Sequence, residues 1–239
     1  MSYCVSSYLF RKIMKNTLIT TVLFDMDGVL IDSEGFWQQA EQEVFTSMGA
    51  IWDEEIAIQT QGKTTRAVTE LWYSLFPWEG KSIEEVEQMV IDRVDELIST
   101  EGEIKEGVIQ TLNFLKERKV KIGLATNSPE SLINTVLKRL GIRDYFQTIV
   151  SVDHVEHGKP APDVYLRAAH NLGSEPRECL VVEDSFTGAT AGKNAGMTVV
   201  AIPDHLQYEQ ERFDIADFKL KSMIFLNENI VSFLHEVTV

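Results

Sequence analysis

The sequence is poor in cysteine, in basic residues and in long apolar runs. Its 239 residues hold two cysteines, Cys4 and Cys179, which excludes the disulfide framework of a small secreted domain. No apolar run is long enough to cross a bilayer as a helix. Residues 1–13 also lack the basic start and apolar stretch of a secretory signal. We therefore expect a cytoplasmic protein with no membrane partner and a buried thiol at Cys179.

The scarcity of basic residues gives the chain a strongly acidic balance. Its 22 lysines and arginines stand against 37 acidic residues, so the formal charge at pH 7 is −15. Binding to nucleic acid through phosphates needs clustered lysine and arginine, and we therefore expect no nucleic-acid partner. Between residues 35 and 104 there are 15 acidic and 4 basic residues. An anionic substrate would need local cations or a metal ion to offset this field.

Short apolar runs alternate with amphipathic segments over most of the chain. The runs at 21–24, 120–125, 148–150, 179–182 and 198–202 predict buried strands. The segments between the last four have the apolar spacing of helices. This alternation predicts an α/β fold, with a Rossmann-like, doubly wound parallel sheet and helices on both of its faces.

Capping residues mark where several of these helices begin and end. Ser128 followed by Pro129 predicts an N-cap and a first helical position, and Gly141 suits the end of the same helix. Ser185 predicts the N-cap of the helix after the strand at 179–182. We therefore expect each of these helices to start at the carboxyl-terminal edge of the sheet, where open α/β sheets bind their ligands.

The segment from 35 to 104 has a different pattern, because it is helical and contains no clear strand. Ser82 followed by Glu85 is a capping-box signal, and all four tryptophans lie in this segment. We interpret it as an inserted helical domain above the sheet edge. The predicted organisation is a disordered N-terminal extension at 1–15, an α/β core at 16–34 and 105–239, and a helical cap at 35–104.

Chemically active side chains follow four of the predicted strands. They are Asp25 and Asp27 after 21–24, Thr126 and Asn127 after 120–125, Lys159 after 148–150, and Glu183 and Asp184 after 179–182. The carboxyl ends of parallel strands meet at one sheet edge, so we expect these residues to converge. Carboxylates so close together repel each other unless a cation lies between them. Acids that hold Mg²⁺, with a hydroxyl, an amide and a lysine for phosphoryl oxygens, indicate phosphoryl transfer.

Each of these elements has an ordinary structural explanation when it is taken alone. An Asp-x-Asp-Gly sequence is often an acidic turn, and Lys159 between glycine and proline is typical of a solvated loop. Glu183 and Asp184 also stand where residues before a helix N-cap would stand. The specific signal is the combination, with every element at a strand end.

The motifs resemble those of the haloacid dehalogenase superfamily. They are Asp25-Met26-Asp27-Gly28-Val29-Leu30, Thr126-Asn127-Ser128, Gly158-Lys159-Pro160-Ala161-Pro162-Asp163 and Val182-Glu183-Asp184-Ser185. Asp32-Ser33-Glu34 and Leu71-Trp72-Tyr73 are similar to the sugar-phosphate phosphatases of that superfamily. The resemblance implies a Mg²⁺-dependent phosphatase with a small helical cap. Its expected partner is a small phosphorylated sugar or polyol, and we expect a monomer.

The resemblance also implies a role for each motif residue. Asp25 would be the nucleophile that forms an aspartyl-phosphate, and Asp27 would protonate the leaving alcohol and then activate water. The implied Mg²⁺ ligands are the Asp25 side chain, the Asp27 backbone carbonyl and Asp184, with Glu183 as either a ligand or a support for the metal shell. Lys159, Thr126 and the Asn127 backbone would bind the phosphoryl group.

The tryptophans of the helical segment have two expected roles. Their mixed spacing indicates the core of a helical bundle for Trp52, Trp72 and Trp78. Trp37 is the exception, because it lies close to the first motif in the sequence. We expect Trp37 to contact the bound sugar.

Two alternative functions remain open at this stage. A mutase resembling β-phosphoglucomutase would carry histidine where this chain has Trp37 and arginine where it has Thr65, three residues after Gly62. Lys63 and Arg66 lie nearby and offer replacements for that arginine. A non-enzymatic phospho-accepting module would use similar acids, but it would be much shorter and would lack the helical insertion.

Overall fold

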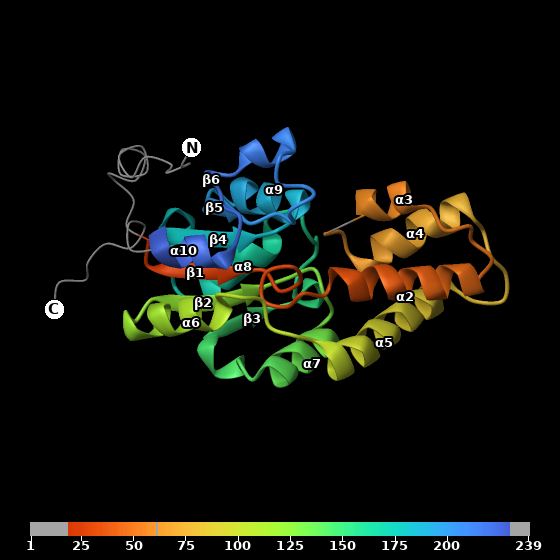
Figure 1. Cartoon of the computed structure of the whole chain (residues 1–239), viewed down its shortest axis with the longest axis horizontal. Coiled ribbons are helices and arrows are strands. Elements are labelled where there is room, and N and C mark those ends of the chain that lie inside the picture. The colour runs from red at the N-terminus through yellow and green to blue at the C-terminus, as the bar shows by residue number, and fades with distance from the viewer. Residues whose placement is uncertain (1–18, 61, 230–239) are drawn as a thin grey trace.

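The computed structural model describes residues 19–60 and 62–229, so the extension predicted at 1–15 lies outside the described residues. Its core is a six-stranded sheet of order β3-β2-β1-β4-β5-β6 in which all neighbouring strands are parallel. The strands are β1 (Thr21–Phe24), β2 (Lys121–Ala125), β3 (Thr148–Val150), β4 (Cys179–Glu183), β5 (Thr198–Ala201) and β6 (Phe218–Lys219). Figure 1 shows helices on both sides of this sheet, which confirms the predicted doubly wound fold.

The two faces of the sheet bury alternate residues of each strand, as the pleat requires. Val22 and Phe24 of β1 belong to the apolar cluster on one face, and Leu23 belongs to the cluster on the other. The first face is covered by α6 (Val108–Glu117), α7 (Glu130–Leu140) and α10 (Met223–Asn229), and the second by α8 (Asp163–Asn171) and α9 (Phe186–Asn194). Since β1 lies inside the sheet with both faces covered, the residues that follow it are held firmly.

Short 3₁₀ helices occupy several of the connections. They are η1 (Arg143–Tyr145), η2 (Val152–His154), η3 (Pro176–Glu178) and η4 (Glu211–Ile215).

The thiol of Cys179, at the start of β4, is buried as predicted. None of the helices within 19–60 and 62–229 combines the length and apolar character needed to traverse a bilayer.

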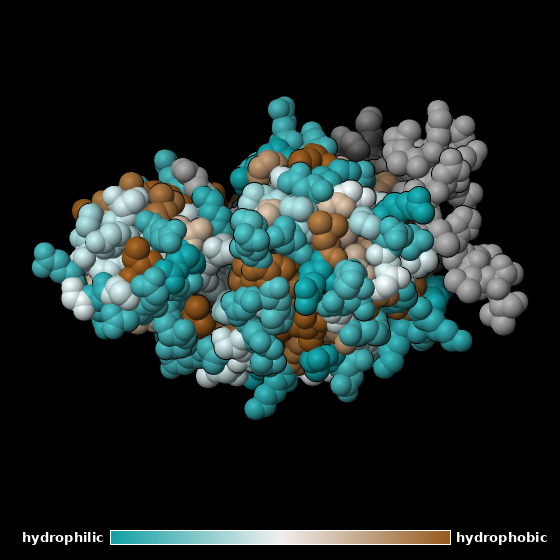
Figure 2. Space-filling view, turned by 180° about the vertical axis from the view of Figure 1, so that it is seen from behind, coloured by the Kyte–Doolittle hydropathy of each residue, from teal (hydrophilic) through white to brown (hydrophobic). Residues whose placement is uncertain are grey.

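A group of helices separates β1 from the rest of the core. They are α2 (Glu34–Ser47), α3 (Glu54–Thr60), α4 (Thr65–Leu75) and α5 (Ile83–Glu101). The described part of this segment contains no strand, and Ser82 and Glu85 form the predicted capping box at the start of α5. Figure 2 shows this helical cap as a smaller lobe beside the core, with hydrophilic side chains over most of the visible face. The residue boundaries proposed for the domains stay a prediction.

The cap has an aromatic core and rests on the sheet domain through its longest helix. The Trp72 side chain is fully buried between Trp52 and Phe45, at ring-centroid distances of 5.1 and 5.3 Å. At the joint, α5 packs against α7, and Arg139 Nε donates a hydrogen bond to the carbonyl of Gly102 at 2.9 Å. The cap is therefore anchored to the core through the pair of helices α5 and α7.

The start of α7 differs from the prediction, because the predicted capping residue Ser128 bonds to Asp27 instead. Helix α7 begins at Glu130 with Pro129 in the N-cap position, and the Ser128 hydroxyl donates to Asp27 at 2.6 Å instead. The prediction that Ser128 caps this helix was wrong because a carboxylate competes for its hydroxyl. The predictions for Ser185 as an N-cap and Gly141 as a left-handed helix end are confirmed.

Gly123 in β2 occupies a position without room for a side chain. A Cβ atom there would lie 2.8 Å from Leu23 Cδ2 and 2.9 Å from Thr148 Cγ2. We expect Gly123→Ala to lower the free energy of unfolding by about 1–3 kcal/mol, the usual cost of overpacking a core. Gly35→Ala is the matched control, because no atom lies within 4 Å of its Cβ position in α2. Urea unfolding should show a loss for Gly123→Ala alone, and equal stability of the two variants would contradict this packing.

Candidate active site

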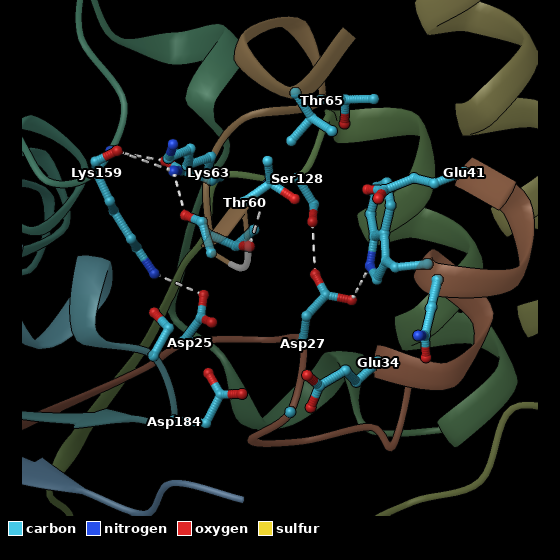
Figure 3. A pocket seen from close by; sticks show the side chains of 18 of the residues that line it. Asp25, Asp27, Glu34, Glu41, Thr60, Lys63, Thr65, Ser128, Lys159 and Asp184 are labelled. Atoms are coloured by element: carbon cyan, nitrogen blue, oxygen red, sulfur yellow. Dashed lines mark hydrogen bonds and ion pairs between the residues drawn. The ribbon is translucent and has the colours of Figure 1, made fainter. Parts of the chain in front are cut away.

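The carboxyl ends of the central strands and the cap enclose one cavity. Asp25 follows β1, Thr126 follows β2 and Asp184 follows β4, while Lys159 lies on the loop that leads from β3 to α8. Of the predicted site residues, the cavity is lined by Asp25, Asp27, Trp37, Thr126, Asn127, Lys159 and Asp184. Glu183 is fully buried and lies outside this lining. Figure 3 shows Lys159 and Asp184 on either side of Asp25, with Asp27 farther along the cavity.

Lys159 joins two carboxylates in the interior of the protein. Its Nζ atom lies 2.6 Å from Asp25 Oδ1 and 2.7 Å from Glu183 Oε1, and its side chain is 2% exposed. Burial alone would lower the pKa of Lys159, but the two carboxylates outweigh it and hold the pKa above its usual value. The ammonium group is therefore a fixed positive charge beside Asp25.

Both oxygens of Glu183 are occupied by hydrogen bonds from the protein. Besides Lys159, the Tyr165 hydroxyl donates to Oε1 at 2.5 Å. The backbone N–H and the hydroxyl of Ser185 donate to Oε2 at 3.3 and 3.1 Å. Glu183 thus holds Lys159 from behind, on the side away from the cavity.

The positive charge around Asp25 and Asp184 does not offset the effect of their burial and of their mutual repulsion. Burial raises the pKa of Asp25 to about 7 against the opposing effect of Lys159, and burial with repulsion from Glu183 and Asp25 also raises the pKa of Asp184. Oxygen atoms of Asp25, Glu183 and Asp184 lie within 4.8 Å of one another. Among the described residues no hydrogen bond reaches the Asp184 carboxylate. An oxygen-binding divalent cation such as Mg²⁺ fits this arrangement, because it would relieve the repulsion.

Gly28 allows Asp184 to lie close to the loop after β1. Its φ of +70° belongs to the left-handed region, which favours glycine. A Cβ atom at Gly28 would lie 1.8 Å from Asp184 Oδ2. Glycine in the first motif is therefore needed both for the turn and for the approach of the acidic groups.

Asp27 receives hydrogen bonds from the cap side and from the core side. Ser33 Oγ and Trp37 Nε1 donate to its Oδ1 at 2.6 and 2.9 Å, and Ser128 Oγ donates to its Oδ2 at 2.6 Å. Ser33 and Trp37 belong to the start of α2, whereas Ser128 directly precedes α7. The sequence interpretation missed both serines as partners of Asp27, although each lies within or next to a motif. Contact of Trp37 with a bound sugar stays a prediction.

Asn127 fixes the lysine loop and also reaches the cap. Its Oδ1 accepts from the Lys159 backbone N–H at 2.8 Å, and its Nδ2 donates to the carbonyls of Lys159 and Gly62 at 3.2 and 3.0 Å. Thr126 Oγ1 accepts from the Ser128 backbone N–H at 3.2 Å, which leaves the hydroxyl proton of Thr126 for a ligand. The side chain of Asn127 therefore has a structural role beside the phosphate-binding role predicted for its backbone.

The cap contributes a second group of residues to the cavity, and the set of predicted site residues did not include them. They are Glu34, Gln38, Glu41, Ala57, Ile58, Thr60, Gly62, Lys63, Thr65 and Val68. Glu41 differs from the other charged members because its residue surface is only 8% exposed. Burial raises the pKa of Glu41 to about 8. No local sequence motif predicts a buried glutamate at this position, because its burial depends on the packing of α2 against other cap helices.

The fold and the site together define an α/β protein of Rossmann-like topology with a helical cap over acidic strand ends. The family model described as haloacid dehalogenase-like hydrolase matches residues 19–196. The chain belongs to this family, which confirms the resemblance found in the motifs.

The chain is also similar in sequence or structure to individual proteins of known or assigned activity. The chain is 36% identical over 206 residues to "Hexitol phosphatase B" of Escherichia coli (strain K12), covering 86% of this chain and 93% of that protein. It is 32% identical over 176 residues to "Phosphorylated carbohydrates phosphatase" of Thermotoga maritima, covering 74% and 81%. A crystal structure of β-phosphoglucomutase from Clostridium difficile covers 90% of this chain and 100% of its own, with a TM-score of 0.77 and 24% identity. That last likeness concerns the fold alone.

Removal of the Lys159 ammonium group should destabilise the fold. Lys159→Met would leave Asp25 and Glu183 buried without their shared counter-charge, and we expect the free energy of unfolding to fall by about 3 kcal/mol. Lys193→Met is the control, because Lys193 and Asp217 form a partly exposed pair with side chains 32% and 28% exposed. Such pairs contribute about 0–1 kcal/mol. Urea unfolding in EDTA at pH 8 checks this, and equal losses for both variants would contradict the role of Lys159.

The stability of the protein should depend on pH through Glu41. Its pKa rises from 4.5 to about 8 on folding, so the stability it contributes is fully present below pH 4.5 and is lost as the pH approaches 8. We expect Glu41→Gln to gain stability relative to the wild type across this range, by at most about 1.4 kcal/mol per pH unit.

Urea unfolding at several pH values between 5 and 8 measures this gain. Glu43→Gln is the control on the same helix, because hydrogen bonds from Arg93 and Gln39 lower the pKa of Glu43 and its titration falls below that range. A difference between Glu41→Gln and the wild type that stays constant with pH would show that Glu41 does not titrate there.

Proposed function

We propose that the protein is a Mg²⁺-dependent phosphatase that hydrolyses phosphate monoesters of small sugars or polyols through an aspartyl-phosphate. The observation that carries this proposal is the convergence of Asp25, Asp27, Lys159 and Asp184 from separate strand ends into one capped cavity. The names of two relatives, a hexitol phosphatase and a phosphorylated carbohydrates phosphatase, favour the same substrate class.

In this proposal Asp25 is the nucleophile. Its ion pair with Lys159 at 2.6 Å orients the carboxylate and favours its ionised form at the bottom of the cavity. Attack on phosphorus forms a bond between phosphorus and an Asp25 oxygen, and the bond to the leaving alcohol breaks. Asp27 gives a proton to that alcohol and later takes one from the water that hydrolyses the aspartyl-phosphate. The second step restores both acids and releases inorganic phosphate.

The same residues supply the metal and phosphate contacts. Bound Mg²⁺ would neutralise charge on the phosphoryl oxygens and draw the anionic groups together. We assign its protein ligands to the Asp25 and Asp184 carboxylates and the Asp27 backbone carbonyl, and we assign Glu183 to holding Lys159. We assign the Thr126 hydroxyl and the Asn127 backbone N–H as donors to phosphoryl oxygens. The cap above them would exclude bulk water during the first step.

The mutase alternative is not favoured. Trp37 stands where the mutase pattern has histidine, and its indole N–H donates to Asp27 at 2.9 Å. An indole N–H only donates hydrogen bonds and cannot accept or relay a proton as histidine does. The cytoplasmic location and the monomeric state stay predictions from the sequence.

Phosphate release from a panel of hexose, pentose and polyol phosphates tests the proposed function. We expect release with Mg²⁺, none in excess EDTA, and a loss of about 10³-fold or more for Asp25→Asn, which removes the nucleophile but keeps the side-chain shape. Asp32→Asn is the matched control, since Asp32 is exposed and lies outside the cavity lining.

Two outcomes would contradict the proposal. Undiminished release by Asp25→Asn would exclude Asp25 as the nucleophile. Accumulation of glucose 6-phosphate from glucose 1-phosphate with trace bisphosphate, followed by phosphorus NMR, would identify a mutase instead.

A further inference from the structure

Glu41 is a buried acid that the chemistry proposed above does not use. It lies in the middle of α2 in the cap and lines the same cavity as Asp25 and Asp27. Its residue surface is 8% exposed, and among the side chains that the structure describes none forms a hydrogen bond or an ion pair with its carboxyl group. Figure 3 shows that this group points from α2 into the cavity.

The position would be more stable with an apolar side chain. A largely buried carboxyl group without a partner in the protein loses much of its hydration and gains no hydrogen bond in return. The cap residues that line the cavity include the apolar residues Val68, Ala57 and Ile58. An apolar side chain at position 41 would therefore join other apolar groups on the cavity wall. Retention of a carboxyl group at a cost to the fold is typical of a residue that serves a ligand.

The distance of Glu41 from the reacting groups indicates which part of a substrate it would meet. Trp37 lies four residues earlier on the same helix and touches Asp27, the acid assigned to the leaving alcohol. Four residues of an α-helix advance about 6 Å along its axis, and residues four apart share a face. Glu41 therefore lies where a substrate whose ester oxygen is at Asp27 would extend its carbon chain, beyond the reach of a short alcohol.

We propose that Glu41 is a specificity-determining residue that hydrogen-bonds a hydroxyl group of the substrate remote from the phosphate, so that the enzyme selects pentitol or hexitol phosphates and similar sugar phosphates over shorter esters. This inference rests on the proposed function. A hydroxyl group both donates and accepts, so it satisfies the carboxyl group in either protonation state.

The selectivity between a long and a short substrate tests this role. We would measure kcat/KM for sorbitol 6-phosphate and for glycerol 3-phosphate with Mg²⁺, in the wild type, Glu41→Gln, Glu41→Leu and the control Glu43→Gln. We expect the ratio of the two constants to fall about 10–100-fold in Glu41→Leu, mainly through a higher KM for sorbitol 6-phosphate. Glu41→Gln should keep part of the ratio, because an amide still bonds to hydroxyl groups. Glu43→Gln, an exposed change on α2, should keep all of it.

The possible outcomes separate this inference from the proposed function. A wild type that releases phosphate from no member of the hexose, pentose and polyol phosphate panel would overturn both. With an active wild type, an unchanged ratio in Glu41→Leu would overturn the role of Glu41 alone. Thermal melting distinguishes a structural role: we expect Glu41→Leu to melt at or above the wild-type temperature, because an unpaired buried carboxyl group is removed. Earlier melting with equal losses on both substrates would also overturn the proposal.

Discussion

The structure depends on the compensation of buried negative charge by Lys159. Three carboxyl groups, Asp25, Glu183 and Asp184, meet at adjacent strand ends, where burial raises the pKa values of Asp25 and Asp184. Lys159 bonds to two of them and leaves the third, Asp184, without a cation. This incomplete compensation accounts both for the fixed position of the Asp25 carboxylate and for the affinity that the site should have for a metal ion.

Asp27 links the cap to the core, in addition to the contact between α5 and α7. Its carboxylate accepts hydrogen bonds from Ser33 and Trp37 at the start of a cap helix and from Ser128 at the start of a core helix. The acid assigned to the leaving group therefore lies at the joint between cap and core. A displacement of α2 would change the surroundings of this acid directly, so cap position and proton transfer are expected to be coupled.

The sequence was sufficient to predict the parts of the fold and site that depend on local patterns. Apolar runs predicted the five longer strands, whereas β6 has only two residues and leaves no periodic signal. The spacing of Asp25, Lys159 and Asp184 behind strands predicted their convergence, because parallel strands end at one edge. Local rules failed where tertiary contacts compete with them: Ser128 bonds to a carboxylate instead of capping α7. The burial of Glu41 depends on how whole helices pack, and a sequence pattern does not encode that.

The distribution of tryptophan has a consequence for spectroscopy. All four tryptophans lie in the inserted helical segment, three of them in or against its aromatic core, and Trp37 lines the cavity. Intrinsic tryptophan fluorescence therefore reports on the cap and on the mouth of the site, and the sheet domain contributes no emission of this kind. Comparison of that fluorescence with far-ultraviolet circular dichroism, which senses the whole backbone, would reveal whether cap and core melt as one cooperative unit.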